Sequence, residues 1–136
     1  ADIALHLEEV RSIVQGVSQR APMVVQEYRQ RLTERLAELL ENAPVDEGRI
    51  TQEVAIYTDR VAVDEEIARL GSHLSSMEEA MTSAQSMGRR LDFIVQEMNR
   101  EANTIGSKAS DAPLIQLVVS LKSEIEKIRE QVQNIE

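Results

Sequence analysis

The chain has 136 residues, of which 42% are hydrophobic but only 2% aromatic, and its net charge is −9 at pH 7. Cysteine is absent, which excludes disulfides, thiolate metal sites and cysteine nucleophiles. The acidic balance disfavours nucleic acid and anionic membranes as partners of the chain as a whole, and no apolar run approaches the roughly 18 residues that a membrane span needs.

Apolar residues recur at alternating steps of three and four along almost the whole chain, which is the spacing of amphipathic helices. Because aromatic residues are scarce, the core must be built from Leu, Ile, Val, Met and Ala, which suits helix packing better than a sheet. The pattern predicts about six helices. We expect a break or a kink at Pro22 between the first and second helices, since proline damages a helix interior but suits a first turn. The second is expected to end near residues 42–44.

The remaining helices are expected to begin at acidic caps or at glycine. Asp46 and Asp64 are the predicted N-caps of the third and fourth helices, because a carboxylate can accept the free backbone N–H groups there. Gly88 is expected to separate the fourth helix from the fifth. Asp111 is the predicted cap of a last helix, which has heptad spacing over residues 111–136.

These elements predict an all-α fold, an elongated helical bundle that forms a single domain over residues 1–136. A helix of about 20 residues is about 30 Å long, so the longer helices would span much of the bundle. The heptad stripes at both ends of the chain favour packing against another helix. A non-catalytic oligomerisation or protein-interaction module is therefore the alternative function.

Polar and charged residues concentrate between residues 64 and 108. Residues 45–84 carry three basic and nine acidic side chains, a net charge of −6, whereas residues 85–108 carry four and three, a net charge of +1. A divalent cation would be drawn to the first of these segments and a phosphate to the second. Residues 64–108 are therefore the candidate site region.

Carboxylates and one imidazole in this region have the spacing of a shared site. Glu66 and His73 lie seven residues apart on one helix face, and Glu97 and Glu101, at positions i and i+4, can offer two carboxylates to one divalent cation. Arginines and a lysine on the same helix can neutralise a phosphate while the metal activates water. The alternative is a solvated helix surface that ion pairs between neighbouring turns hold together.

Three further residues are given no part in this chemistry. His6 has no functional group beside it in the sequence, so no role is assigned to it. Tyr57 and Phe93 are expected in the core rather than as base-stacking groups. The sequence also lacks a glycine-rich phosphate loop and an aromatic platform for stacking bases.

A long polar run begins at Gly88. It reads Gly88-Arg89-Arg90-Leu91-Asp92-Phe93, then Gln96-Glu97-Met98-Asn99-Arg100-Glu101-Ala102-Asn103-Thr104, then Ser107-Lys108. This run resembles the signature of the YicC-like family of bacterial endoribonucleases. The run Glu65-Glu66-Ile67-Ala68-Arg69-Leu70 with Ser72-His73 is similar to the family's preceding motif, and residues 128–136 are similar to its C-terminus. The resemblance covers the whole chain but only the C-terminal half of a typical member.

The resemblance implies a metal-dependent endoribonuclease of the bacterial cytoplasm, with manganese or a similar divalent ion and a hexameric assembly that encloses RNA. The catalytic groups and metal ligands would then be Glu66, His73, Glu97 and Glu101. The RNA phosphate contacts would be Arg69, Arg90, Arg100 and Lys108, oriented by Asn99, Asn103 and Thr104. With a net charge of −9, the isolated chain is expected to bind RNA weakly. Full activity would need the family's N-terminal domain and assembly.

Overall fold

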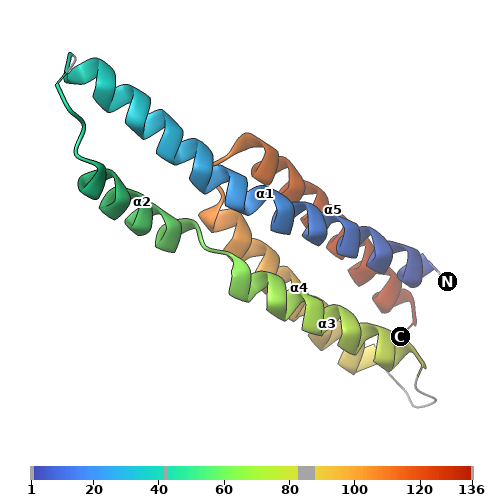
Figure 1. Ribbon diagram of the computed structural model, residues 1–136. Helices are drawn as coiled ribbons and strands as arrows, with labels where there is room; N and C mark the ends of the chain where they lie inside the picture. The colour runs from blue at the N-terminus through green and yellow to red at the C-terminus, as the bar shows by residue number, and fades with distance from the viewer. Residues whose placement is uncertain (1, 42, 83–87, 136) are drawn as a thin grey trace.

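The computed structural model describes residues 2–41, 43–82 and 88–135, and every regular element in these ranges is a helix. The five helices are α1 (Asp2–Leu39), α2 (Glu47–Val61), α3 (Asp64–Thr82), α4 (Gly88–Lys108) and α5 (Ala112–Ile135). The prediction of an all-α, elongated fold is confirmed (Figure 1). The predicted count of six helices is wrong, because the first two expected helices form one.

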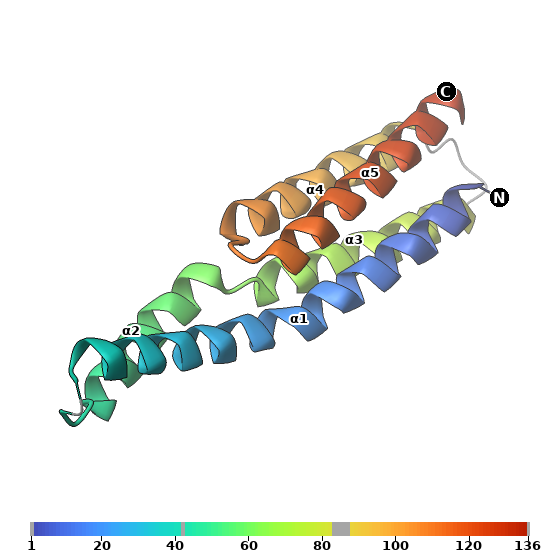
Figure 2. The ribbon, with the colours of Figure 1, turned by 90° about the horizontal axis from the view of Figure 1, so that it is seen from above.

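The helix α1 continues through Pro22, where the sequence predicted a break or a kink, so the break did not form. A proline inside a helix costs roughly 3 kcal/mol, since it removes one backbone hydrogen bond and crowds the preceding turn. Buried Val17 and Val24 on either side of it keep α1 packed on the core. Arg20 also spans the proline, with ion pairs of 2.6 Å to Glu27 and 2.7 Å to Asp111 at the start of α5. Figure 2 shows the result as a bend partway along α1.

The first half of α1 forms a four-helix bundle with α3, α4 and α5. In this bundle α1 packs against α5, α5 against α4, α4 against α3, and α3 against α1 (Figures 1 and 2). The two heptad stripes expected to attract partner helices are buried against each other and the other bundle helices. The buried positions are Ile3, Leu7, Val10, Val14 and Val17 on α1, and Leu114, Val118, Leu121, Ile125, Ile128 and Val132 on α5.

His6 has a structural role that the sequence did not reveal. Its Nδ1 lies 2.7 Å from Glu124 Oε2 on α5, and Lys127 Nζ donates to Glu124 Oε1 over 3.0 Å. Burial raises the pKa of Glu124, but the hydrogen bonds from Lys127 and His6 outweigh it, so that the net pKa is lowered. The contact between His6 and Glu124 therefore stabilises the packing of the start of α1 against α5.

The second half of α1 and all of α2 form a two-helix arm that extends beyond the bundle (Figure 1). Tyr28 and Tyr57 stack across the arm with ring centroids 3.9 Å apart. The Tyr57 hydroxyl also lies 2.9 Å from Ser110 Oγ, between α4 and α5. Tyr57 packs against the core, as the sequence predicted. The stacked tyrosines thus hold α2 against the second half of α1. The Tyr57 hydroxyl also connects the arm to the bundle.

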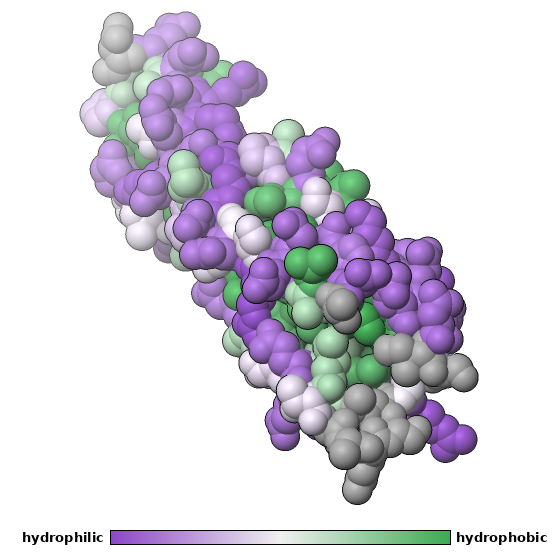
Figure 3. All heavy atoms as spheres, turned by 90° about the vertical axis from the view of Figure 1, so that its right-hand side faces the viewer, coloured by the Kyte–Doolittle hydropathy of each residue, from purple (hydrophilic) through white to green (hydrophobic). Residues whose placement is uncertain are grey.

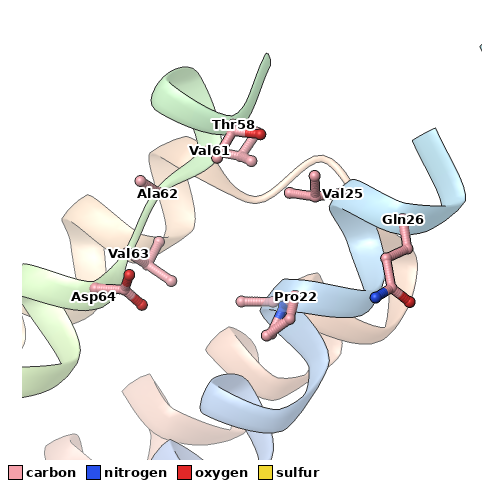
Figure 4. A pocket seen from close by; sticks show the side chains of 9 residues that line it. Pro22, Val25, Gln26, Thr58, Val61, Ala62, Val63 and Asp64 are labelled. Atoms are coloured by element: carbon pink, nitrogen blue, oxygen red, sulfur yellow. The ribbon is translucent and has the colours of Figure 1, made fainter. Parts of the chain in front are cut away.

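A cleft of about 370 Å³ opens where the arm meets the bundle (Figure 4). Pro22 and Val25 from α1 face Thr58, Val61 and the α2–α3 junction across it. Its lining is mostly apolar, with Asp64 as its one charged residue among the described side chains. This cleft lacks the convergent polar groups of a catalytic pocket.

The predicted helix starts are largely confirmed. The Asp46 side chain accepts a hydrogen bond from the Arg49 backbone N–H, and the Asp111 side chain accepts one from the Leu114 N–H. Asp64 is the first residue of α3 rather than the residue before it, a difference of one position. No described helix is long and apolar enough to cross a membrane.

Candidate functional site: a buried carboxylate–cation cluster

The candidate site lies along the contact between α3 and α4, which run antiparallel in the bundle (Figure 1). Each helix turns an apolar face to the core, with Leu70 and Met77 on α3 and Leu91 and Met98 on α4 fully buried. The residues at the edge of those faces meet where the two helices touch. The amphipathic pattern therefore determines which polar side chains reach the seam between the helices.

Four predicted site residues meet at this seam and form what we call the carboxylate–cation cluster: Glu66, Arg69, Glu101 and Lys108. Arg69 Nε donates to both carboxylate oxygens of Glu101, each over 2.9 Å. Lys108 Nζ donates to Glu66 Oε1 over 2.7 Å and to the carbonyl oxygen of Ala62 over 2.8 Å. The two carboxylates are buried, with side chains 5% and 7% exposed. Each of these two carboxylates is thus paired with a cation from the opposite helix.

The electrostatics of the cluster favour the charged forms of Glu66 and Arg69. Burial raises the pKa of Glu66, but the hydrogen bond and charge of Lys108, together with the charge of Arg69, outweigh it, so that the net pKa is lowered. The hydrogen bond to Glu101 raises the pKa of Arg69. The cluster therefore favours the ionised form of Glu66 and the charged form of Arg69.

One oxygen of the cluster lacks a partner. Oε2 of Glu66 is buried and accepts no hydrogen bond from the part of the chain that the structure describes. An unsatisfied buried acceptor costs about 1–3 kcal/mol. Such an atom is unusual in a folded protein and marks Glu66 as a residue with acceptor capacity to spare.

The residues present do not fit a complete divalent-metal site within one chain. Both oxygens of Glu101 are engaged by Arg69, and one oxygen of Glu66 is engaged by Lys108. Over residues 2–41, 43–82 and 88–135, no group of three or more His, Asp or Glu side chains could hold a metal ion. The four predicted ligands therefore do not form a coordination sphere in this structure.

The other two predicted catalytic groups, His73 and Glu97, lie one turn further along the seam. His73 is four residues after Arg69 on α3, and Glu97 is four residues before Glu101 on α4. Because the two helices are antiparallel, both residues are displaced in the same direction, by about 6 Å along the helix axes from the Arg69–Glu101 pair. The described contacts include no ion pair between them. Glu97 instead lies 3.9 Å from Arg100.

The remaining predicted contacts are dispersed over α4. Arg90, Arg100 and Asn99 are exposed to solvent. The Thr104 hydroxyl donates to the Arg100 carbonyl oxygen over 3.1 Å and so is engaged within its own helix. Asn103 lines a groove between α4 and α5, away from the cluster. Among the described residues, none of the three side chains expected to orient the cations has a hydrogen bond to the side chain of Arg69 or Lys108.

Phe93 was expected in the core, and this prediction is wrong because its side chain is exposed at 63%. Leu91, Ile94 and Val95 occupy the buried positions around it. Their spacing already identifies the core-facing stripe of α4, and Phe93 falls outside that stripe. The helical phase was thus a better guide than the hydrophobicity of the residue.

Comparison with known proteins agrees with the motif resemblance. A family model described as "Endoribonuclease YicC-like, C-terminal" matches residues 17–136. The chain is 46% identical over 136 residues, 99% of its length, to the "Probable endoribonuclease YicC" of Clostridioides difficile (strain 630). It is 37% identical over 134 residues, 98% of its length, to the protein of the same name from Haemophilus influenzae. The chain spans 46% and 44% of these two relatives. It belongs to the YicC-like endoribonuclease family and corresponds to the family's C-terminal region.

Proposed function

We propose that the chain is the C-terminal part of an endoribonuclease of its relatives' length, called the full-length protein below, and that the α3–α4 seam contacts RNA. The observation that carries the proposal is the pair of cations, Arg69 and Lys108, that buried Glu101 and Glu66 hold at this seam. Cations fixed in advance stabilise charge on a phosphate without reorganising. The names of the two relatives support RNA as the substrate, and the proposal places the protein in the bacterial cytoplasm.

The proposed mechanism assigns phosphate binding to the seam. Glu101 holds Arg69 by its Nε, while the terminal nitrogens of Arg69 lie 3.4 Å from Glu65 and 4.0 Å from Glu66. These weakly engaged nitrogens can donate to phosphate oxygens in pairs. The exposed Arg90 and Arg100 would extend the contact along α4. His73 and Glu97, one turn away, are the acid–base groups of the proposal.

Replacing Arg100 by glutamine is expected to lower kcat/KM of the full-length protein for RNA about tenfold and to reduce the dependence of binding on salt, because one phosphate contact is lost. Arg100 is a suitable residue because its side chain is 77% exposed and its ion pair with Glu97 is long, at 3.9 Å. The melting temperature should not change. The measurement is initial cleavage rates at several salt concentrations.

The matched control is Arg11→Gln. Arg11 is also an exposed arginine, and it pairs over 2.6 Å with Glu78 on α3, on the side of that helix that faces α1. The Arg11→Gln variant of the full-length protein should cleave RNA at the wild-type rate. Equal losses in both variants would mean that general charge, and not the α3–α4 seam, attracts the RNA.

Manganese dependence is a separate part of the proposal and rests on the family resemblance rather than on ligand geometry. Manganese is expected to raise the melting temperature of the full-length protein, because a ligand stabilises the state that it binds. The shift should disappear in Glu97→Ala, since Glu97 is 29% exposed and free of the buried ion pairs. Differential scanning fluorimetry with and without manganese measures this. An equal shift in the wild type and in Glu97→Ala would exclude Glu97 as a ligand.

The second candidate function is a helical assembly module, and exposed apolar residues favour it. Ile115 and Val119 on α5 are 47% and 59% exposed, and Leu5 on α1 is 65% exposed. Figure 3 shows hydrophobic residues in small groups on an otherwise hydrophilic face. A homo-oligomer, a hexamer in the full-length protein, would cover such residues. Assembly and RNA cleavage are compatible with each other.

A further inference from the structure

Phe93 is an aromatic side chain outside the buried core of the described residues. It is 63% exposed in the second turn of α4, a helix whose core positions are filled by aliphatic residues. The chain has only one phenylalanine and no tryptophan. An exposed aromatic ring contributes little to folding and has a flat apolar face available for a ligand.

The residues around Phe93 on α4 are polar and partly cationic. Arg89 and Arg90 lie one turn before it, and Gln96 and Glu97 one turn after it. The segment 85–108 that contains them is the part of this acidic chain with a positive net charge, +1. Protein interfaces also use aromatic residues and arginine, but they place the aromatic anchor in a desolvated, apolar centre. An exposed ring between cationic and polar residues is the arrangement that binds the bases and phosphates of a nucleic-acid strand.

Phe93 also lies in line with the proposed phosphate contacts. Phe93, Glu97 and Glu101 follow one another at steps of four residues, so they form one stripe along α4. Phe93 is about 12 Å from Glu101 along the helix axis, since each residue adds about 1.5 Å. A strand whose phosphates contact the carboxylate–cation cluster would therefore pass the ring.

We propose that Phe93 stacks on an unpaired base of single-stranded RNA, with Arg89 and Arg90 contacting the neighbouring phosphates. This inference rests on the proposed function, which it deepens by naming the substrate class of the α3–α4 seam. Stacking on an aromatic ring tolerates any base, because every base has a π-face. The ring would thus select unpaired RNA rather than a particular sequence.

The test measures RNA binding and cleavage by the full-length protein with Phe93→Ala, Phe93→Trp and the control Ile56→Ala, whose residue is 54% exposed on α2. Phe93→Ala should raise KM and Kd about tenfold with an unchanged kcat, the loss expected for one stacked base. Phe93→Trp should restore wild-type values, and Ile56→Ala should not change them.

A set of RNAs that each lack one base provides the decisive comparison. The wild type should bind about tenfold more weakly when one particular base is missing, and Phe93→Ala should bind that RNA and the intact RNA equally. Equal Kd values for the wild type and Phe93→Ala on all RNAs would overturn the inference. So would a loss of binding that follows a change in oligomeric mass, since Phe93 would then bind a second copy of the chain. A wild-type protein that neither binds nor cleaves RNA would overturn the proposed function itself.

Discussion

Replacing Lys108 by methionine is expected to lower the free energy of unfolding by about 3 kcal/mol at pH 7, because a buried charge that loses its partner is strongly destabilising. Lys108 Nζ lies 2.7 Å from Oε1 of Glu66, whose side chain is 5% exposed. The other oxygen of Glu66 has no hydrogen-bond partner among the residues that the structure describes. The lysine also donates to the Ala62 carbonyl oxygen at the α2–α3 junction. Urea denaturation of the 136-residue chain measures the loss.

Two further variants separate this effect from a general effect of losing a lysine. Lys122→Met removes an exposed lysine on α5 and should change stability by less than about 0.5 kcal/mol. The double variant Lys108→Met, Glu66→Met should recover most of the loss, since apolar replacements of a buried ion pair are often neutral. Glu66→Met alone completes the comparison. If the stability losses of Lys108→Met and Glu66→Met simply added in the double variant, the ion pair would not be the cause.

The same ion pair gives the stability a predictable pH dependence. The pKa of Glu66 is lowered in the folded protein, so its contribution is present above the unfolded-state pKa of about 4.3 and is lost as the pH falls through the folded value. In Lys108→Met, Glu66 is still buried but no longer has the lysine beside it, so the pKa of Glu66 is expected to rise. The stability difference between the wild type and Lys108→Met should therefore shrink as the pH falls from 7 towards 4.

Replacing Glu101 by glutamine is expected to reduce kcat of the full-length protein on RNA by about 100-fold, in the range seen when one preorganised group of a catalytic site is lost. Glu101 is a positioning residue in this proposal, since both of its oxygens hold Arg69 Nε. Glutamine keeps the shape of the side chain but loses the charge and one acceptor. Arg69 would then adopt several orientations at the seam.

The readout must distinguish positioning from a purely structural role. Glu78→Gln is the matched control, because Glu78 also pairs with an arginine, Arg11, and lies on the α1 side of α3. Helical circular dichroism and oligomeric mass should be unchanged in both variants. A normal kcat in Glu101→Gln would remove the Arg69–Glu101 pair from the site, and an equal loss in Glu78→Gln would make the effect unspecific.

The sequence by itself determined the helical class, most helix ends and the family, and it indicated the segment that is proposed as the site. These features depend on short-range information: the apolar steps of three and four, the caps Asp46 and Asp111, and the contiguous run that starts at Gly88. Glu66 and Glu101 were found in the same way. Their chemical types and helical phase were visible without knowing any partner.

Only the tertiary structure decided how these residues combine. In the tertiary structure α1 continues through Pro22, the two heptad stripes pack against each other within one chain, and Phe93 is exposed. The tertiary structure also joined Arg69 to Glu101 and Lys108 to Glu66, pairs that are 32 and 42 residues apart in the sequence. Helical periodicity gives the face on which a residue lies, but not which helix covers that face or at what register. Packing of the aliphatic core sets both, and so determines which charges meet.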